Sequence, residues 1–168
     1  MLKKCLVSIA AIVLSLQGLS AVQAQQLIPA PPELAAKAWI LVDANTGHVL
    51  VESEADMQLP PASLAKMMTT YIVSNEIAAG RMSKDEMVLI SDNAWEKGGA
   101  KTDGSTMFLN PRTRVSVSDL MRGVIIQSGN DASIALAEHI SGDEIAFADV
   151  MNHQASLLGM NGTEYYNA

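Results

Sequence analysis

Strand-forming residues are confined to one short part of this chain, and this restriction limits its possible folds more than any other feature. Residues 38–43 and 48–52 form two β-rich runs on either side of an Asn-Thr-Gly sequence at 45–47. Two such runs around a turn-forming sequence predict a β-hairpin. After Glu52 only residues 87–90 resemble a strand, so the sequence predicts no clear neighbour for the hairpin.

Four helices are predicted to follow the hairpin. The first begins near Ser63 and ends at Gly80, because glycine commonly ends a helix. Its apolar residues recur at helical spacing and predict a core-facing stripe of Leu64, Met67, Met68, Tyr71 and Ile72. The other three helices are predicted at about 118–128, 131–140 and 143–158, with Ser118 as the first cap. The predicted layout is one hairpin followed by four helices, which is an α+β fold.

The hairpin also predicts that this chain is only part of a domain. Two strands rarely stand alone in water and need further strands or a layer of helices. Residues 81–111 are rich in turns and irregular apart from the short strand. We therefore expect the N-terminal portion of a truncated domain, with the remaining sheet strands missing.

The first 24 residues are predicted to lie outside the folded domain. They contain Lys3 and Lys4, an apolar run from Cys5 to Leu19, and an Ala-Val-Gln-Ala sequence at 21–24. This order is typical of a secretory signal peptide, and the apolar run is too short to span a membrane. We expect cleavage after Ala24 and a single partial domain over residues 25–168.

The charge of the remaining chain argues against nucleic-acid binding. Removal of Lys3 and Lys4 leaves 9 basic against 18 acidic residues, which changes the formal net charge from −7 to −9. An acidic chain without a basic block lacks the main attraction to phosphates. The only cysteine, Cys5, would leave with the signal peptide. The three histidines show no metal-ligand spacing, so no metal site is expected.

The sharpest chemical signal is the sequence Ser-Leu-Ala-Lys at 63–66. Residues three apart on a helix lie about one turn from each other, so Ser63 and Lys66 are expected together at the edge of the buried stripe. Partial burial there would lower the pKa of Lys66 and let it act as a base towards the Ser63 hydroxyl. The same pattern also arises by chance, and a serine at a helix start is most often only a cap.

Two tripeptides compete for the role of a second catalytic element. Ser-Asp-Asn at 91–93 is the sequence associated with β-lactamases, whereas Ser-Gly-Asn at 128–130 has the looser Ser-x-Asn form. Position favours the second tripeptide, because it falls at the break between two apolar helices, where a tight loop can direct side chains into a cleft. The first tripeptide lies in an expected polar turn. We therefore assign Ser128 and Asn130 to the candidate site.

These motifs together resemble the low-molecular-mass penicillin-binding proteins, and most closely the serine-type D-alanyl-D-alanine carboxypeptidases among them. The resemblance rests on Pro-Ala-Ser-Leu-Ala-Lys-Met-Met-Thr at 61–69 and on Ile-Gln-Ser-Gly-Asn-Asp-Ala at 126–132. Supporting matches lie at 40–47, 92–95 and 104–109. The resemblance covers nearly all of residues 25–168 and implies a β-lactamase/transpeptidase-like fold.

The resemblance also implies a role for each motif residue. Ser63 would form an acyl-enzyme with a peptidoglycan stem peptide that ends in D-Ala-D-Ala. Lys66 would take the proton of Ser63, and Ser128 would help to protonate the leaving D-alanine. Asn130 would hold the substrate amide and help to keep Lys66 in place. β-Lactam antibiotics would acylate Ser63 in the same way, and no cofactor would be needed. The expected location is the periplasm.

The sequence departs from the family pattern after the Ser-x-Asn loop. The family has a third element there, a Lys-Thr-Gly on a sheet strand, which would complete the oxyanion hole. The Lys-Thr-Asp-Gly at 101–104 has an inserted residue and precedes Ser128, so it is not assigned to this role. The family's membrane-binding C-terminal tail is also absent, and contact with the inner membrane is expected only through such a tail. The alternatives are a related serine endopeptidase, a β-lactamase, or a catalytically inactive penicillin-binding fragment.

Overall fold

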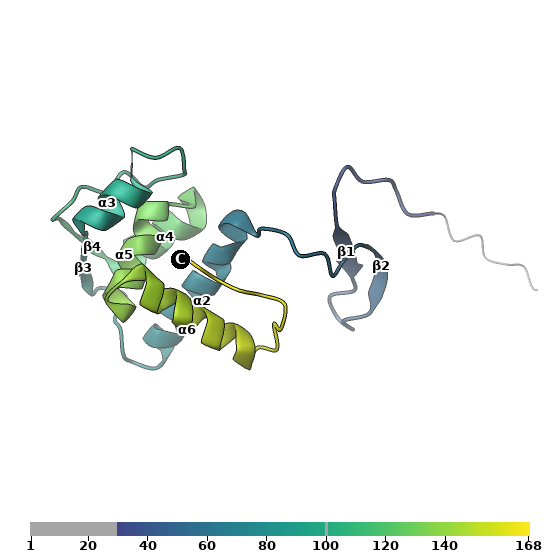
Figure 1. Cartoon of the computed structure of the whole chain (residues 1–168). Coiled ribbons are helices and arrows are strands. Elements are labelled where there is room, and N and C mark those ends of the chain that lie inside the picture. The colour runs from purple at the N-terminus through teal and green to yellow at the C-terminus, as the bar shows by residue number, and fades with distance from the viewer. Residues whose placement is uncertain (1–29, 100) are drawn as a thin grey trace, which may run out of the picture. The chain divides into compact units, whose positions relative to one another are not determined.

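The computed structural model describes residues 30–99 and 101–168. These residues divide into one unit that ends at Met57 and a second unit from Gln58 to Ala168 (Figure 1). The predicted signal peptide lies outside the described residues, so cleavage after Ala24 stays a prediction. Within the described ranges, no helix is long and apolar enough to cross a membrane.

The first unit contains the predicted hairpin. Strands β1 (Trp39–Val42) and β2 (Val49–Ser53) pair antiparallel. The turn between them is closed by the Asp43 carboxylate, which accepts hydrogen bonds of 2.8 Å from both the hydroxyl and the backbone N–H of Thr46. These bonds, the hydroxyl bond first, hold the pKa of Asp43 below its usual value. In the described part of the chain the two strands pair only with each other.

The second unit is mainly helical. Its elements are η1 (Ala62–Ala65), α2 (Lys66–Ala78), β3 (Met87–Leu89), α3 (Asp92–Gly98), β4 (Arg114–Ser116), α4 (Val117–Gln127), α5 (Asn130–Ser141) and α6 (Glu144–Leu157). Three predicted helix ends are confirmed by glycines that have a positive φ, namely Gly80, Gly142 and Gly159. Such a conformation is open to glycine without strain.

The prediction of four helices and one hairpin is wrong between residues 81 and 116. Helix α3 begins there after Ser91, whose Oγ accepts a hydrogen bond of 2.8 Å from the Ala94 N–H. Strand β4 pairs antiparallel with β3 and forms a second two-stranded sheet. Helix α4 then begins two residues earlier than expected, with Ser116 as its cap instead of Ser118. Elements of three to seven residues are too short to show a clear hydrophobic period.

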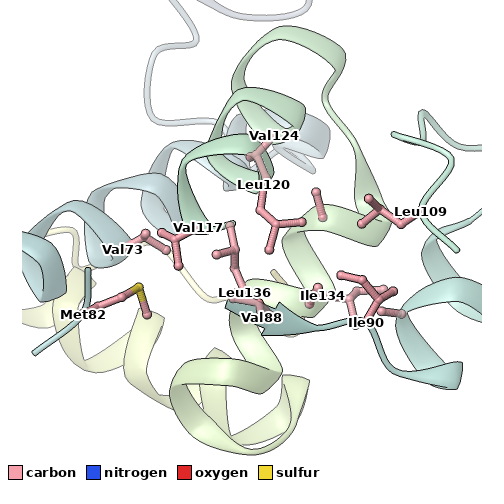
Figure 2. Packing of buried hydrophobic residues seen from close by; sticks show 13 residues of the cluster. Val73, Met82, Val88, Ile90, Leu109, Val117, Leu120, Val124, Ile134 and Leu136 are labelled. Atoms are coloured by element: carbon pink, nitrogen blue, oxygen red, sulfur yellow. The ribbon is translucent and has the colours of Figure 1, made fainter. Parts of the chain in front are cut away.

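Helix α5 lies at the centre of the second unit. It packs against α2, α3, α4, α6 and β3 (Figure 1), and residues 131–137 are all buried. One cluster of buried side chains surrounds Leu120 and Leu136 (Figure 2), and a second cluster surrounds Phe147. The N-terminus of α5, where Asn130 lies, is therefore anchored by a buried helix.

Helix α2 buries a different face from the predicted one. The buried residues of η1 and α2 are Ala65, Met68, Thr69, Ile72 and Val73. Three members of the predicted stripe are exposed instead, namely Leu64, Met67 and Tyr71. The helix carries apolar residues around most of its circumference, so hydrophobic spacing alone does not select a face. Small side chains at positions 65 and 69 belong to the face that packs.

Candidate active site

Ser63 lies on η1, a short 3₁₀ turn that leads directly into α2. Residues three apart eclipse each other in a 3₁₀ helix, so Ser63 and Lys66 share one face, and the Lys66 N–H donates to the Ser63 carbonyl oxygen. Ala62, which precedes Ser63, has a φ of +48°. This left-handed conformation costs a non-glycine residue about 1–2 kcal/mol. The strained turn places Ser63 at the exposed surface of the chain.

Lys66 joins the two predicted motifs. It is half-buried, and its Nζ donates a hydrogen bond of 2.6 Å to Oδ1 of Asn130, 64 residues away in the sequence. Burial lowers the pKa of Lys66, because removing an ammonium group from water disfavours its charge. At a given pH more of the amine is then neutral. This is the direction required of a base that takes a proton from Ser63.

Ser128 and Asn130 lie on either side of the break between α4 and α5. Ser128 has a φ of +55°, and its Oγ is buried without a hydrogen-bond partner among the described residues. A buried hydroxyl without a partner costs about 1–3 kcal/mol. Strained backbone conformations cluster at functional sites, so the geometry of Ser128 favours a functional role. The roles of Ser128 and Asn130 in catalysis stay predictions.

The competing tripeptide at 91–93 has contacts that stabilise α3. Ser91 caps the helix, and the Asp92 carboxylate pairs with Arg112 at 3.0 Å. The Asn93 amide donates a hydrogen bond of 2.7 Å to Oε1 of Glu138 on α5. All three side chains therefore have a structural role, which supports the choice of the Ser-x-Asn loop after α4.

The Lys-Thr-Asp-Gly sequence contacts α3 at one end and the candidate site at the other. Lys101 Nζ lies 4.2 Å from the centroid of the Trp95 ring, within the range of a cation–π interaction. A Cβ atom added to Gly104 would lie only 2.3 Å from Nδ2 of Asn130. Gly104 was not predicted from the sequence to be part of the site. Its only sequence signal is a glycine in a turn-rich segment, which does not reveal the distant residue that it contacts.

Asp131 is a second residue near the site that the sequence analysis missed. Its side chain is fully buried. Oδ1 accepts hydrogen bonds of 2.8 and 2.9 Å from the N–H groups of Met107 and Ala132. Oδ2 accepts hydrogen bonds of 2.8 and 2.9 Å from the Thr106 hydroxyl and the Leu109 N–H. The available signal is an acidic residue that begins a helix otherwise rich in Ala, Ile and Leu.

The functional groups of the candidate site are hydroxyls, an amine and a carboxamide. They belong to Ser63, Ser128, Lys66 and Asn130. A serine hydroxyl on the same helical face as a partly desolvated lysine is suited to covalent acyl transfer. In the part of the chain that the structure describes, no group of three or more His, Cys, Asp or Glu residues could hold a metal ion.

The sequence matches a known family model over residues 25–168, and the model describes the peptidase S11 D-alanyl-D-alanine carboxypeptidases. This chain belongs to that family. Among curated carboxypeptidases, it is 45% identical over 147 residues to D-alanyl-D-alanine carboxypeptidase DacC of Escherichia coli strain K12. That match covers 87% of this chain and 36% of DacC. The family resemblance predicted from the motifs is therefore confirmed.

Two solved structures share the fold of this chain. D-alanyl-D-alanine carboxypeptidase DacD from Francisella tularensis superposes with a TM-score of 0.75 and 47% identity, over 83% of this chain and 32% of DacD. Penicillin binding protein 5 from Haemophilus influenzae gives a TM-score of 0.77 and 42% identity, over 83% of this chain and 40% of that protein. The predicted β-lactamase/transpeptidase-like α+β fold is confirmed. The chain thus spans well under half the length of these relatives.

Proposed function

We propose that the complete protein is a serine-type D-Ala-D-Ala carboxypeptidase that removes the terminal D-alanine from peptidoglycan pentapeptides. The observation that carries the proposal is the 2.6 Å hydrogen bond from Lys66 Nζ to Asn130 Oδ1. It brings the Ser-x-x-Lys turn and the Ser-x-Asn loop into one site. The carboxypeptidases and the penicillin binding protein among the relatives support this substrate class and β-lactams as inhibitors.

Acylation begins at Ser63. Its Oγ attacks the carbonyl carbon of the penultimate D-alanine, while its proton moves to the neutral amine of Lys66. The bond from that carbon to the terminal D-alanine nitrogen then breaks. Ser128 passes a proton to the leaving nitrogen and is reprotonated by the Lys66 ammonium, so that free D-alanine departs, an ester remains on Ser63 and the Lys66 amine is neutral again. A β-lactam follows the same path, because its strained amide takes the place of the peptide bond.

Asn130 binds the substrate and also holds Lys66. Lys66 Nζ donates to Oδ1 in this contact, so the carboxamide turns its oxygen towards Lys66. The amide nitrogen is then left to donate to a carbonyl of the substrate. In the second half of the reaction water attacks the ester, releases the shortened peptide and returns the proton to Ser63.

We also propose that the protein acts in the periplasm after removal of residues 1–24. The family match begins at residue 25, which supports a boundary between a leader and the domain at this point. Intact-mass analysis of exported protein tests the proposal, and a mature chain that keeps Cys5 would contradict it. Contact with the inner membrane through a C-terminal tail is likewise proposed, and fractionation of the full-length protein tests it.

The test of the activity uses the full-length protein and two readouts. Labelling with a fluorescent penicillin and release of D-alanine from a D-Ala-D-Ala peptide should both disappear in Ser63→Ala. Ser156→Ala is the matched control, because Ser156 is an exposed serine on α6, and this variant should behave as the wild type. Persistent label on Ser63→Ala would contradict the assignment of the nucleophile.

A further inference from the structure

The Asp131 carboxylate ties the start of α5 to the segment 104–109. Of its four hydrogen bonds, three come from that segment, donated by Thr106, Met107 and Leu109. Both carboxylate oxygens act only as acceptors, and the side chain is fully buried. A carboxamide of the same shape would present an NH₂ group to two of these donors. The arrangement therefore requires an acid at this position.

The carboxylate also stabilises a strained turn within this segment. Phe108 has a φ of +60° and is 69% exposed, so its own side chain gains little from packing here. The residues on either side of it, Met107 and Leu109, both donate their N–H groups to Asp131. Left-handed backbone of this kind persists only where surrounding contacts hold it. The hydrogen bonds to Asp131 supply such contacts.

The same segment lies directly against Asn130. The Asn130 N–H donates a hydrogen bond of 2.8 Å to the Ser105 carbonyl oxygen. A Cβ atom on Gly104 would approach Nδ2 of Asn130 to 2.3 Å, so segment 104–109 reaches both the backbone and the side chain of Asn130. A shift of this segment would move the carboxamide that accepts the Lys66 hydrogen bond.

A purely structural role as a helix cap accounts for only one of the four bonds. The residue before α5 is Gly129, which has no side-chain cap, and only the bond from the Ala132 N–H to Asp131 lies within the helix. The other three bonds hold the segment that supports Asn130.

We propose that Asp131 is a positioning residue for acyl transfer. Its carboxylate fixes the segment 104–109, and that segment holds the Asn130 carboxamide in the orientation in which Oδ1 accepts from Lys66. The inference rests on the proposed function, because it assumes that Asn130 and Lys66 act in the acylation of Ser63.

The main test is a double-mutant cycle in the full-length protein, with the acylation rate by fluorescent penicillin as the readout. Asp131→Asn keeps the shape of the side chain and should slow acylation roughly 10- to 100-fold, because small displacements of catalytic groups have effects of this size. Asn130→Ala should have a comparable effect. The double variant should be no slower than Asn130→Ala, because Asp131 acts through Asn130 and the two losses are not additive.

The pH dependence of acylation separates positioning from simple destabilisation. A hydrogen bond from the charged amine to Asn130 favours the charged form, so its loss lowers the pKa of Lys66. The acid limb, which is the pH range over which the acylation rate rises as Lys66 loses its proton, should therefore move to lower pH in both Asp131→Asn and Asn130→Ala. A defect in folding alone would reduce the amount of active protein and leave the limb in place.

One control variant and one alternative variant allow the result for Asp131→Asn to be interpreted. Asp149→Asn changes an exposed carboxylate on α6 and should match the wild type. If Asp131→Asn does not fold, Thr106→Val decides. It removes the hydroxyl that donates to Asp131 and accepts from the Phe108 N–H, and it should slow acylation several-fold with the same shift of the limb. The inference is overturned if folded Asp131→Asn acylates within twofold of the wild type, or if Thr106→Val does so when Asp131→Asn does not fold. It is also overturned if the effects of Asp131→Asn and Asn130→Ala are additive in the double variant. Failure of the proposed function is distinct, because the wild type itself would then not release D-alanine from a D-Ala-D-Ala peptide.

Discussion

The two turns that carry the candidate chemistry are built in opposite ways. Both contain a non-glycine residue with a positive φ, Ala62 in the first turn and Ser128 in the second. The first turn leaves Ser63 exposed on a short 3₁₀ helix. The second turn buries the Ser128 hydroxyl and continues into α5, whose start is held by Asp131.

The two turns therefore respond differently to substitution, because the first supplies the nucleophile and the base whereas the second is held in position by a buried helix. The first turn supplies a nucleophile and a base, Ser63 and Lys66, and substitutions there should remove a reacting group. The second turn is anchored in the buried core of α5, so substitutions near it should act by shifting Ser128 or Asn130. Kinetic effects should therefore be largest in the first turn and smaller with distance from the reacting atoms in the second.

After Ser63→Ala, which removes the nucleophile itself, Lys66→Gln should have the largest effect. The substitution removes the base but keeps a side chain that can still contact Asn130, and loss of a proton-transfer group typically costs about 10²- to 10⁴-fold. Stopped-flow acylation with a fluorescent penicillin measures it. Lys84→Gln, at an exposed lysine, is the control and should leave the rate unchanged. A loss of less than tenfold for Lys66→Gln would exclude Lys66 as the base.

Ser128→Ala should cost roughly a hundredfold in turnover, which is within the usual scale for a proton-transfer partner. The comparison is with Ser91→Ala, which should leave turnover within a few-fold. That variant should instead lower the free energy of unfolding by about 1 kcal/mol, because α3 loses its cap. The opposite ranking of the two variants in D-alanine release would show that the Ser-Asp-Asn tripeptide is the catalytic one.

The acylation rate of the wild type should rise with pH through the pKa of Lys66. Only the neutral amine can accept the Ser63 proton, so well below that pKa the rate should change about tenfold per pH unit. Burial lowers the pKa of Lys66 below its ordinary value of 10.5, so the midpoint of this limb should lie below that value. A rate that is independent of pH, or a midpoint at 10.5 or above, would contradict a desolvated lysine base.

Gly104→Ala should have the smallest kinetic effect of these changes, roughly five- to tenfold in acylation. The added Cβ would meet Nδ2 of Asn130 at 2.3 Å, so the carboxamide must move, and small misplacements of this kind slow catalysis. Gly162→Ala is the matched control, because nothing lies within 4 Å of its added Cβ. Equal rates for the two variants would show that Asn130 adapts without loss.

Features that depend on neighbouring residues were predicted well from the sequence. The hairpin at β1 and β2 and the helix ends at Gly80, Gly142 and Gly159 follow from local turn chemistry. The contact between the Ser-x-x-Lys turn and the Ser-x-Asn loop was also anticipated, but from the resemblance of the two motifs to a family. Helical spacing on its own could not have paired Lys66 with Asn130.

Features that depend on distant contacts were not predicted. The face of α2 that packs is chosen by α4, α5 and α6, which the apolar spacing of Leu64, Met67 and Tyr71 does not encode. In the sequence, Asp131 is only an acidic residue at the start of the helix predicted at about 131–140. Its role becomes visible only when the segment around Thr106, some 25 residues earlier, is folded against it.

The geometry of Ser128 has a consequence for protein engineering. Glycine would adopt the same φ of +55° without strain and would remove a buried hydroxyl that lacks a partner among the described residues. After the entropy that glycine adds to the unfolded chain, Ser128→Gly should raise the free energy of unfolding by about 1–2 kcal/mol. Directed evolution that selected only for heat resistance would therefore enrich glycine at this position. Its most stable survivors should release D-alanine roughly a hundredfold more slowly, as expected for loss of the Ser128 hydroxyl. Chemical denaturation and an assay of D-alanine release on the same variant would measure both changes.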